Sequence, residues 1–109
     1  VESREFRLKI LAEDFRAAGT AVLDSLAEYA KEQPGWSIAP DNCEGVRVNL
    51  DKAHGDGWFL LRLSLHDPIL PLNIESDREH GARTIARELA PFLAQQTEID
   101  ASSALEFTL

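Results

Sequence analysis

Residues 57–76 read GWFLLRLSLHDPILPLNIES, a stretch in which two apolar runs flank the short segment 62–68. The apolar runs have the length and the residue types of buried strands, and they predict strands over residues 58–64 and 69–76. Asp67 and Pro68 separate the two runs, because proline lacks a backbone N–H and cannot continue a strand ladder. We therefore expect two antiparallel strands whose connecting loop carries a guanidinium, a hydroxyl and an imidazole.

Alternation of apolar and polar residues predicts two further strands, over residues 5–10 and 45–50. The segment 54–57 contains two glycines, which permit the positive φ of a tight hairpin ahead of the strand at 58–64. Residues 36–39 are a short candidate extended segment, and Pro40-Asp41-Asn42 is typical of a turn.

Apolar residues at steps of three and four predict two amphipathic helices. The first begins after Asp14, which is a favourable N-cap residue, and ends near residues 32–33, ahead of a proline–glycine pair. The second follows Ser76 and Glu79, which have the spacing of a capping box, and it continues to about residue 95.

The C-terminal part of the chain is the least regular. Pro91 predicts a bend or an early end in the second helix, and residues 104–107, within the tail 96–109, suit a turn or an edge strand. The order strand, helix, three strands, helix predicts an α+β fold. We expect a two-layer sandwich, with an antiparallel sheet of about four strands and two helices on one face.

The chain has 109 residues with an ordinary globular composition, which predicts a single domain over residues 1–109. Its single cysteine, Cys43, allows no internal disulfide, which fits a reducing compartment, and no apolar run reaches the length of a membrane span. Methionine is absent, even at the first position, so we expect a domain excised from a longer protein. The net charge of −8 disfavours nucleic-acid and anionic-membrane partners, but it allows a small phosphate ligand.

The loop at 62–68 contains side chains that can bind an oxyanion. Arg62 can donate two hydrogen bonds to a phosphate, the Ser64 hydroxyl can donate a third, and loop amides can complete the site. Both residues would project to the same side of an extended strand. Taken alone, however, the residues favour a simpler interpretation, in which Arg62 is a solvated strand residue and Ser64 begins a turn.

Two histidine–aspartate pairs, His54 with Asp56 and His66 with Asp67, raise the possibility of a metal site or a hydrolase. Their spacings match no established set of metal ligands, and Cys43 has no neighbouring cysteine. Ser64 and His66 lie too close in sequence to suggest a catalytic triad, and no Gly-x-Ser-x-Gly motif occurs. We therefore expect neither a metal site nor a nucleophilic serine with His66 as its base.

The central part of the chain resembles the C-terminal domain of the α-D-phosphohexomutases, the family of phosphoglucomutase and phosphomannomutase. In that family a strand and a hairpin precede the pattern Trp-x-x-x-Arg-x-Ser-x-Thr-x-Pro, which a strand ending near Glu-Ala or Glu-Ser and a helix follow. The resemblance covers residues 45–89 and rests on Gly45-Val46-Arg47-Val48, Trp58, Arg62, Ser64, Pro68 and Ile74-Glu75-Ser76. This chain departs from the pattern at Leu65, His66 and Asp67, and it has Pro71 where a basic residue is frequent.

The resemblance implies a fold similar to the TATA-binding-protein half-repeat and a role in phosphate binding. Arg62 and Ser64 correspond to side-chain phosphate ligands, Leu65 would contribute its amide, and His66 could replace a threonine hydroxyl with a ring N–H. The parent enzyme would move a phosphoryl group between the 1- and 6-positions of a hexose phosphate, through a phosphoserine and a bisphosphorylated intermediate.

The same resemblance implies that this domain contains no catalytic residue. The phosphoserine and the Mg²⁺ would belong to other domains of the same cytoplasmic enzyme, and this domain would close over the active site. Two other classes of function stay open. One is a non-enzymatic α+β module that binds a protein, and the other is a small hydrolase that uses His54 and His66.

Overall fold

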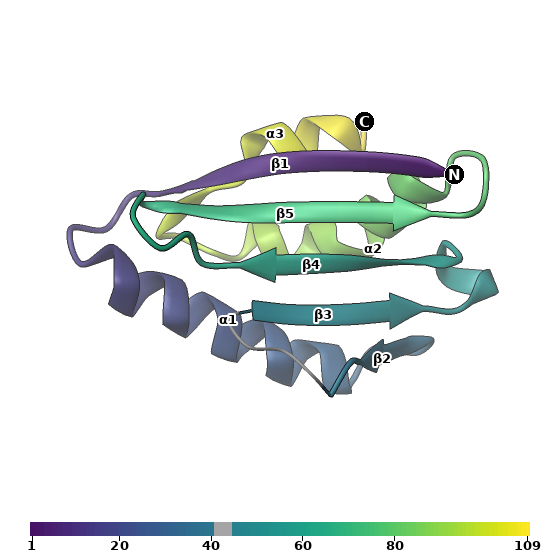
Figure 1. The fold of residues 1–109 in the computed structure, drawn as a ribbon, viewed down its shortest axis with the longest axis horizontal. Helices are drawn as coiled ribbons and strands as arrows, with labels where there is room; N and C mark the ends of the chain where they lie inside the picture. The colour runs from purple at the N-terminus through teal and green to yellow at the C-terminus, as the bar shows by residue number, and fades with distance from the viewer. Residues whose placement is uncertain (41–44) are drawn as a thin grey trace.

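The computed structural model describes residues 1–40 and 45–109. Within these residues the chain forms one antiparallel sheet and a layer of helices packed on it (Figure 1). The sheet order is β2-β3-β4-β5-β1-β6. The strands are β1 (Glu2–Ile10), β2 (Trp36–Ile38), β3 (Gly45–Leu50), β4 (Gly57–Arg62), β5 (Ile69–Ser76) and β6 (Ile99–Asp100). The helices are α1 (Phe15–Lys31), α2 (Gly81–Ala94), α3 (Ser102–Phe107) and the short 3₁₀ helix η1 (Lys52–His54).

The α+β two-layer architecture is confirmed, but the predicted number of strands is wrong, since the described residues form six strands rather than four. The two additional strands are β2 and β6, of three and two residues, at opposite edges of the sheet. Segments of this length are too short for a two-residue period to be recognised in the sequence. The tail likewise forms β6 and the helix α3 in place of the single turn or edge strand expected at 104–107.

The predicted strand at 58–64 is two residues too long at its end, because β4 ends at Arg62. The paired register of β4 and β5 stops at Leu61 opposite Leu72. The Ile69 carbonyl accepts a hydrogen bond from the Ser64 N–H, on the side of β5 that faces β4. Pro71 lies two residues further along β5, so its backbone faces β4 as well. Since proline has no N–H to donate, the ladder opens here and the loop between β4 and β5 begins.

The start of α1 is as predicted, but the start of α2 is not. The Asp14 carboxylate accepts a hydrogen bond from the backbone N–H of Ala17 at 3.1 Å, which makes Asp14 the N-cap of α1. The capping box at Ser76 and Glu79 is wrong, because α2 begins only at Gly81. Ser76 instead ends β5, and its buried hydroxyl donates to the Gly55 carbonyl at 2.5 Å.

The second helix also continues through Pro91 to Ala94, so the predicted early end is wrong. Pro91 lies in the interior of α2, where a proline removes one backbone hydrogen bond from the helix. Packing of Leu89, Phe92 and Leu93, all buried, compensates for that loss and keeps the segment helical. The predicted turn at 40–42 and the predicted role of Cys43 lie outside the described residues.

One side of the sheet is covered by helices and the other is open (Figure 1). Along β1, Leu8 and Ile10 are buried, whereas Arg7 and Lys9 are exposed, and the same alternation runs through β3 and β4. We call the uncovered side the open face. Its residues on the four longest strands are Ser3, Glu5, Arg7, Lys9, Gly45, Arg47, Asn49, Trp58, Leu60, Arg62, Ile69, Pro71, Asn73 and Glu75.

Among residues 1–40 and 45–109, none of the helices combines the length and the apolar character that a membrane crossing requires. The longest, α1, alternates buried small residues with polar ones facing outward.

Candidate anion-binding site

The loop between β4 and β5, residues 63–68, is fixed at both ends by backbone hydrogen bonds. The Ser64 N–H donates to the Ile69 carbonyl at 3.0 Å, and the Ile69 N–H donates to the Asp67 carbonyl at 2.7 Å. The Pro68 carbonyl accepts from the N–H of Ile10 at 2.7 Å, which ties the loop to the end of β1. The loop is therefore anchored to both neighbouring strands.

Helix α1 holds the middle of the same loop. The Arg16 guanidinium donates a hydrogen bond to the Leu65 carbonyl. One turn further on, Gly19 has no side chain, and a Cβ built there would lie 2.7 Å from Cδ1 of Leu63. The absence of a side chain at Gly19 thus allows Leu63 to pack close to the helix. The contact of Arg16 could not be predicted from the sequence, because Arg16 lies 49 residues from its partner.

The four residues predicted to bind phosphate lie at the end of β4 and in this loop, but the structure does not gather their side chains on one side of the sheet. Arg62 is the last residue of β4 and is exposed on the open face. Leu65 and His66 are also exposed, with 54% of Leu65 accessible. Ser64 is partly buried and lines a cleft on the helix side of the sheet. The expectation that Arg62 and Ser64 project to the same side of one strand is therefore wrong, because β4 ends at Arg62 and strand alternation does not extend to Ser64.

Several donors at this end of the sheet have no acceptor within residues 1–40 and 45–109. The Arg62 guanidinium forms no hydrogen bond or ion pair there, and neither does the His66 ring. The backbone N–H groups of Leu65, His66 and Asp67 donate to no acceptor in the same part of the chain. Consecutive free amides are a suitable environment for a tetrahedral oxyanion, and Arg62 ends the strand that leads into them.

A cleft of about 360 Å³ opens between this loop, α1 and the start of β3. Arg16 and Asp24 contribute one charge of each sign to its walls, so the cleft has no marked preference for an anion. The lining residues are Arg16, Thr20, Leu23, Asp24, Ala27, Gly45, Val46, Leu63, Ser64 and Leu65.

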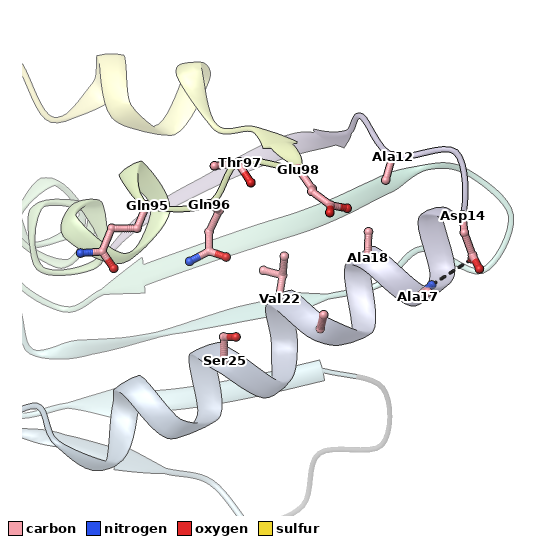
Figure 2. A pocket seen from close by; sticks show the side chains of 11 residues that line it. Ala12, Asp14, Ala17, Ala18, Val22, Ser25, Gln95, Gln96, Thr97 and Glu98 are labelled. Atoms are coloured by element: carbon pink, nitrogen blue, oxygen red, sulfur yellow. Dashed lines mark hydrogen bonds between the residues drawn. The ribbon is translucent and has the colours of Figure 1, made fainter.

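A larger cavity, of about 440 Å³, lies between α1 and the segment 95–98 that follows α2. Figure 2 shows Ala18 and Val22 of α1 on one side of it, and the polar side chains of residues 95–98 on the other. Its charged lining residues are Asp14 and Glu98, both acidic. Carboxylates repel a phosphate, so the loop is a better candidate for an anion than this cavity.

The two histidines of the hydrolase alternative are far apart. His54 lies in η1, before the first residue of β4, and His66 lies in the loop after its last residue. A six-residue strand is about 20 Å long, so the two rings cannot act on one substrate bond. His54 instead contacts the Glu88 carboxylate, Nδ1 to Oε2 at 3.2 Å, and the other oxygen of Glu88 accepts from the Trp36 indole at 2.9 Å.

No cluster of three or more histidine, cysteine, aspartate or glutamate side chains in the described residues could hold a metal ion. The donors gathered at the loop are a guanidinium, a hydroxyl and backbone amides, which attract anions rather than cations.

The fold and the loop together define an α+β sandwich with an anion-binding candidate at one end of its sheet. Comparison with known proteins finds a similar stretch in a probable phosphoglucosamine mutase of Methanopyrus kandleri, with 34% identity over 58 residues. The aligned stretch covers 53% of this chain and 12% of that enzyme, so the chain corresponds to a small part of the length of its relative. No family model matches the chain.

The comparison supports the predicted relation to a phosphohexomutase, although it does not identify the domain. The similarity extends over about half of this chain.

Proposed function

We propose that this chain is the C-terminal, phosphate-binding domain of a phosphohexomutase. The observation that supports the proposal most directly is the position of Arg62, an exposed guanidinium without a protein partner in the described residues, beside the free amides of residues 65–67. The similarity to a probable phosphoglucosamine mutase supports a sugar phosphate as the source of the anion.

In this proposal the domain binds and orients a hexose phosphate but breaks no bond itself. Arg62 offsets the charge of the phosphate with two parallel N–H donors, and the loop amides hold the remaining oxygens. The Ser64 hydroxyl, which lines the cleft on the helix side, is not needed for this contact. His66 is placed to donate from its ring. Fixing the phosphate that does not react holds the sugar in position for transfer at its other end, which lowers the entropic part of the barrier.

The chemistry of transfer would then belong to the rest of a longer, cytoplasmic enzyme. A Mg²⁺ ion in such an enzyme stabilises negative charge on the phosphoryl group that moves. The described residues do not fit this ion, since they contain no cluster of ligands for it. We therefore assign the metal and the phosphoserine to the other domains, which are also the proposed partners of this one.

A titration of the chain with glucose 1,6-bisphosphate, followed by ¹H–¹⁵N NMR, tests the proposal. We expect saturable shifts confined to residues 62–68, and weaker shifts with inorganic phosphate. In Arg62→Ala the affinity falls about tenfold or more, because a hydrogen bond between charged groups contributes about 1.5–3 kcal/mol. Lys52→Ala is the matched control, since it removes one exposed positive charge in η1, at the other end of β4.

Equal affinities in the wild type, Arg62→Ala and Lys52→Ala would contradict the proposal. The open face would then be the better candidate for function, because it carries exposed and half-buried side chains that no element of the described chain covers. That outcome would favour the non-enzymatic module that binds a protein.

A further inference from the structure

Arg7 of β1 lies in the same cross-strand row as Arg62. Arg7 is the register partner of Pro71 in the pairing of β1 with β5. On the other side of β5, Leu61 pairs with Leu72, and continuing this register by one residue sets Arg62 level with Pro71. Residues opposite one another in a sheet project to the same face, so Arg7 and Arg62 flank Pro71 on the open face.

Both arginines are exposed, and neither forms a hydrogen bond or an ion pair within residues 1–40 and 45–109. Other arginines of this chain are engaged with the protein. The guanidinium of Arg78 donates to the Lys52 carbonyl at 2.8 Å, and that of Arg87 donates to the Thr108 carbonyl at 2.8 Å. Two free guanidinium groups in one row are thus a distinctive feature of this end of the open face.

The nearest charged residues of the same strand, Glu5 and Lys9, do not neutralise the charge of the Arg7 guanidinium. Lys9 is the register partner of Asp100, and its charge contributes to the lowered pKa of that carboxyl group, after the hydrogen bonds from Ser102. Glu5 lies on the open face two residues before Arg7, but in the described part of the chain it forms no ion pair with it.

Pro71 gives information about the path of the two arginine side chains. It projects to the open face, which no helix covers, and yet it is buried. Arg7 and Arg62 are its cross-strand neighbours, and their aliphatic stems are long enough to lie over the proline ring. Stems packed on Pro71 in this way would bring the two guanidinium groups toward one another.

We infer that Arg7 is a second phosphate-binding residue, which holds the same anion as Arg62 above Pro71; this inference rests on the proposed function. Neighbouring strands are about 4.8 Å apart, so the two Cα atoms are separated by about 10 Å, a distance that two arginine side chains can bridge around one phosphate. A phosphate dianion offsets the repulsion between two guanidinium groups and offers enough oxygens for both.

The expected ligand is therefore a phosphate monoester in its dianionic form, gripped from β1 and β4 at once. The loop amides of residues 65–67 would bind it from the third side. Arg7 lies 55 positions before Arg62 in the sequence, and only the register of the sheet makes the two residues neighbours.

Arg7→Ala, Arg7→Lys and Arg62→Ala, each titrated with glucose 1,6-bisphosphate at constant ionic strength, test the inference. We expect Arg7→Ala to weaken binding about tenfold or more, in the range of one hydrogen bond between charged groups. Arg7→Lys should recover part of the loss, because lysine keeps the charge but not the two parallel donors. Lys52→Ala controls for the change in net charge and should leave affinity within about twofold of the wild type.

A second measurement does not depend on any variant. The Nε–H signals of Arg7 and Arg62 in the wild-type ¹H–¹⁵N spectrum should both shift on addition of the bisphosphate, and both should saturate at the same ligand concentration. The double variant Arg7→Ala/Arg62→Ala should lose less affinity than the sum of the two single losses, as expected for groups that share one ligand.

An unshifted Arg7 Nε–H signal, or an affinity of Arg7→Ala equal to that of Lys52→Ala, would overturn the inference while Arg62 kept its proposed role. If Arg62→Ala binds as the wild type does, the proposed function fails as well. The two failures are distinguishable, because the first leaves the Arg62 effect intact.

Discussion

The Glu2 carboxylate, near the first residue of the chain, caps the second long helix. Its Oε2 accepts from the backbone N–H of His80 at 2.8 Å, and its Oε1 accepts from that of Ala82 at 3.2 Å. His80 occupies the N-cap position in a left-handed conformation, with φ of 65°, and makes no side-chain cap hydrogen bond. A residue almost eighty positions away therefore satisfies the first N–H groups of α2.

These two backbone hydrogen bonds hold the pKa of Glu2 below its ordinary value of 4.5, with smaller contributions from Arg4 and His80. Because the folded-state pKa is the lower one, the stabilisation is fully present above the ordinary pKa and disappears as the pH falls through the folded-state pKa. We expect Glu2→Gln to lower the midpoint of thermal unfolding by a few degrees at neutral pH, and the difference from the wild type to vanish in strong acid.

Thermal unfolding followed by circular dichroism between neutral and strongly acidic pH measures this dependence. Glu5→Gln is the control, since Glu5 is an exposed residue of the same strand. A difference between the wild type and Glu2→Gln that persisted unchanged into strong acid would show that the charge of Glu2 does not stabilise α2.

Ser76 is a second point at which a distant contact replaces the one expected from the sequence. Its hydroxyl is 1% exposed, donates to the Gly55 carbonyl at 2.5 Å, and accepts from the Arg78 N–H at 3.0 Å. We expect Ser76→Ala to destabilise the fold by about 1–3 kcal/mol, because it leaves buried polar groups without partners. Denaturant unfolding measures the loss, and Ser37→Ala, at an exposed position of β2, should change stability by about 0.5 kcal/mol or less.

Gly81 explains why this serine has little freedom to move. A Cβ built on Gly81 would lie 1.9 Å from the Ser76 hydroxyl oxygen, so the start of α2 is packed directly onto that hydroxyl. If Ser76→Ala and Ser37→Ala had equal unfolding midpoints, the hydrogen bond to Gly55 would contribute nothing to stability.

Ser76 also illustrates which parts of the fold the sequence could predict. The strands β1 and β3 and the helix α1 have several turns or alternations each, so their periodicity is a local property and was recognised. The spacing of Ser76 and Glu79 is equally local, but the hydrogen-bond partner of Ser76 is determined by its neighbours in the folded structure. A strand of two residues, such as β6, has too few residues for any period and exists because it pairs with Lys9 and Ile10.

The residues of the candidate site also differ in whether the sequence alone could predict them. Arg62 and the loop residues are adjacent in sequence, so a pattern of residue types was enough to select them. Arg7 belongs to the proposed site because the strand register aligns it with Arg62, and Arg16 belongs to it because α1 packs on the loop. Neither relation can be recognised from one sequence. Prediction of such residues requires the order of the strands and the side of the sheet on which each helix lies.

Arg16 yields the last prediction, because it holds the loop through a backbone carbonyl rather than through the ligand. We expect Arg16→Ala to change stability by about 0.5 kcal/mol or less, since its contact is exposed. The loop, however, loses its attachment to α1 at Leu65, and ordering it again on binding costs about 0.5–1.5 kcal/mol, which weakens the affinity for glucose 1,6-bisphosphate about two- to tenfold.

Backbone ¹⁵N relaxation separates this positioning role from direct binding. In Arg16→Ala the order parameters of residues 65–67 should fall in the free protein, whereas in Arg62→Ala they should stay at the wild-type level. Arg87→Ala serves as the matched control, since its guanidinium also donates to a backbone carbonyl, that of Thr108, but away from the loop. Unchanged order parameters in Arg16→Ala would mean that the strand hydrogen bonds at Ser64 and Pro68 are sufficient to hold the loop.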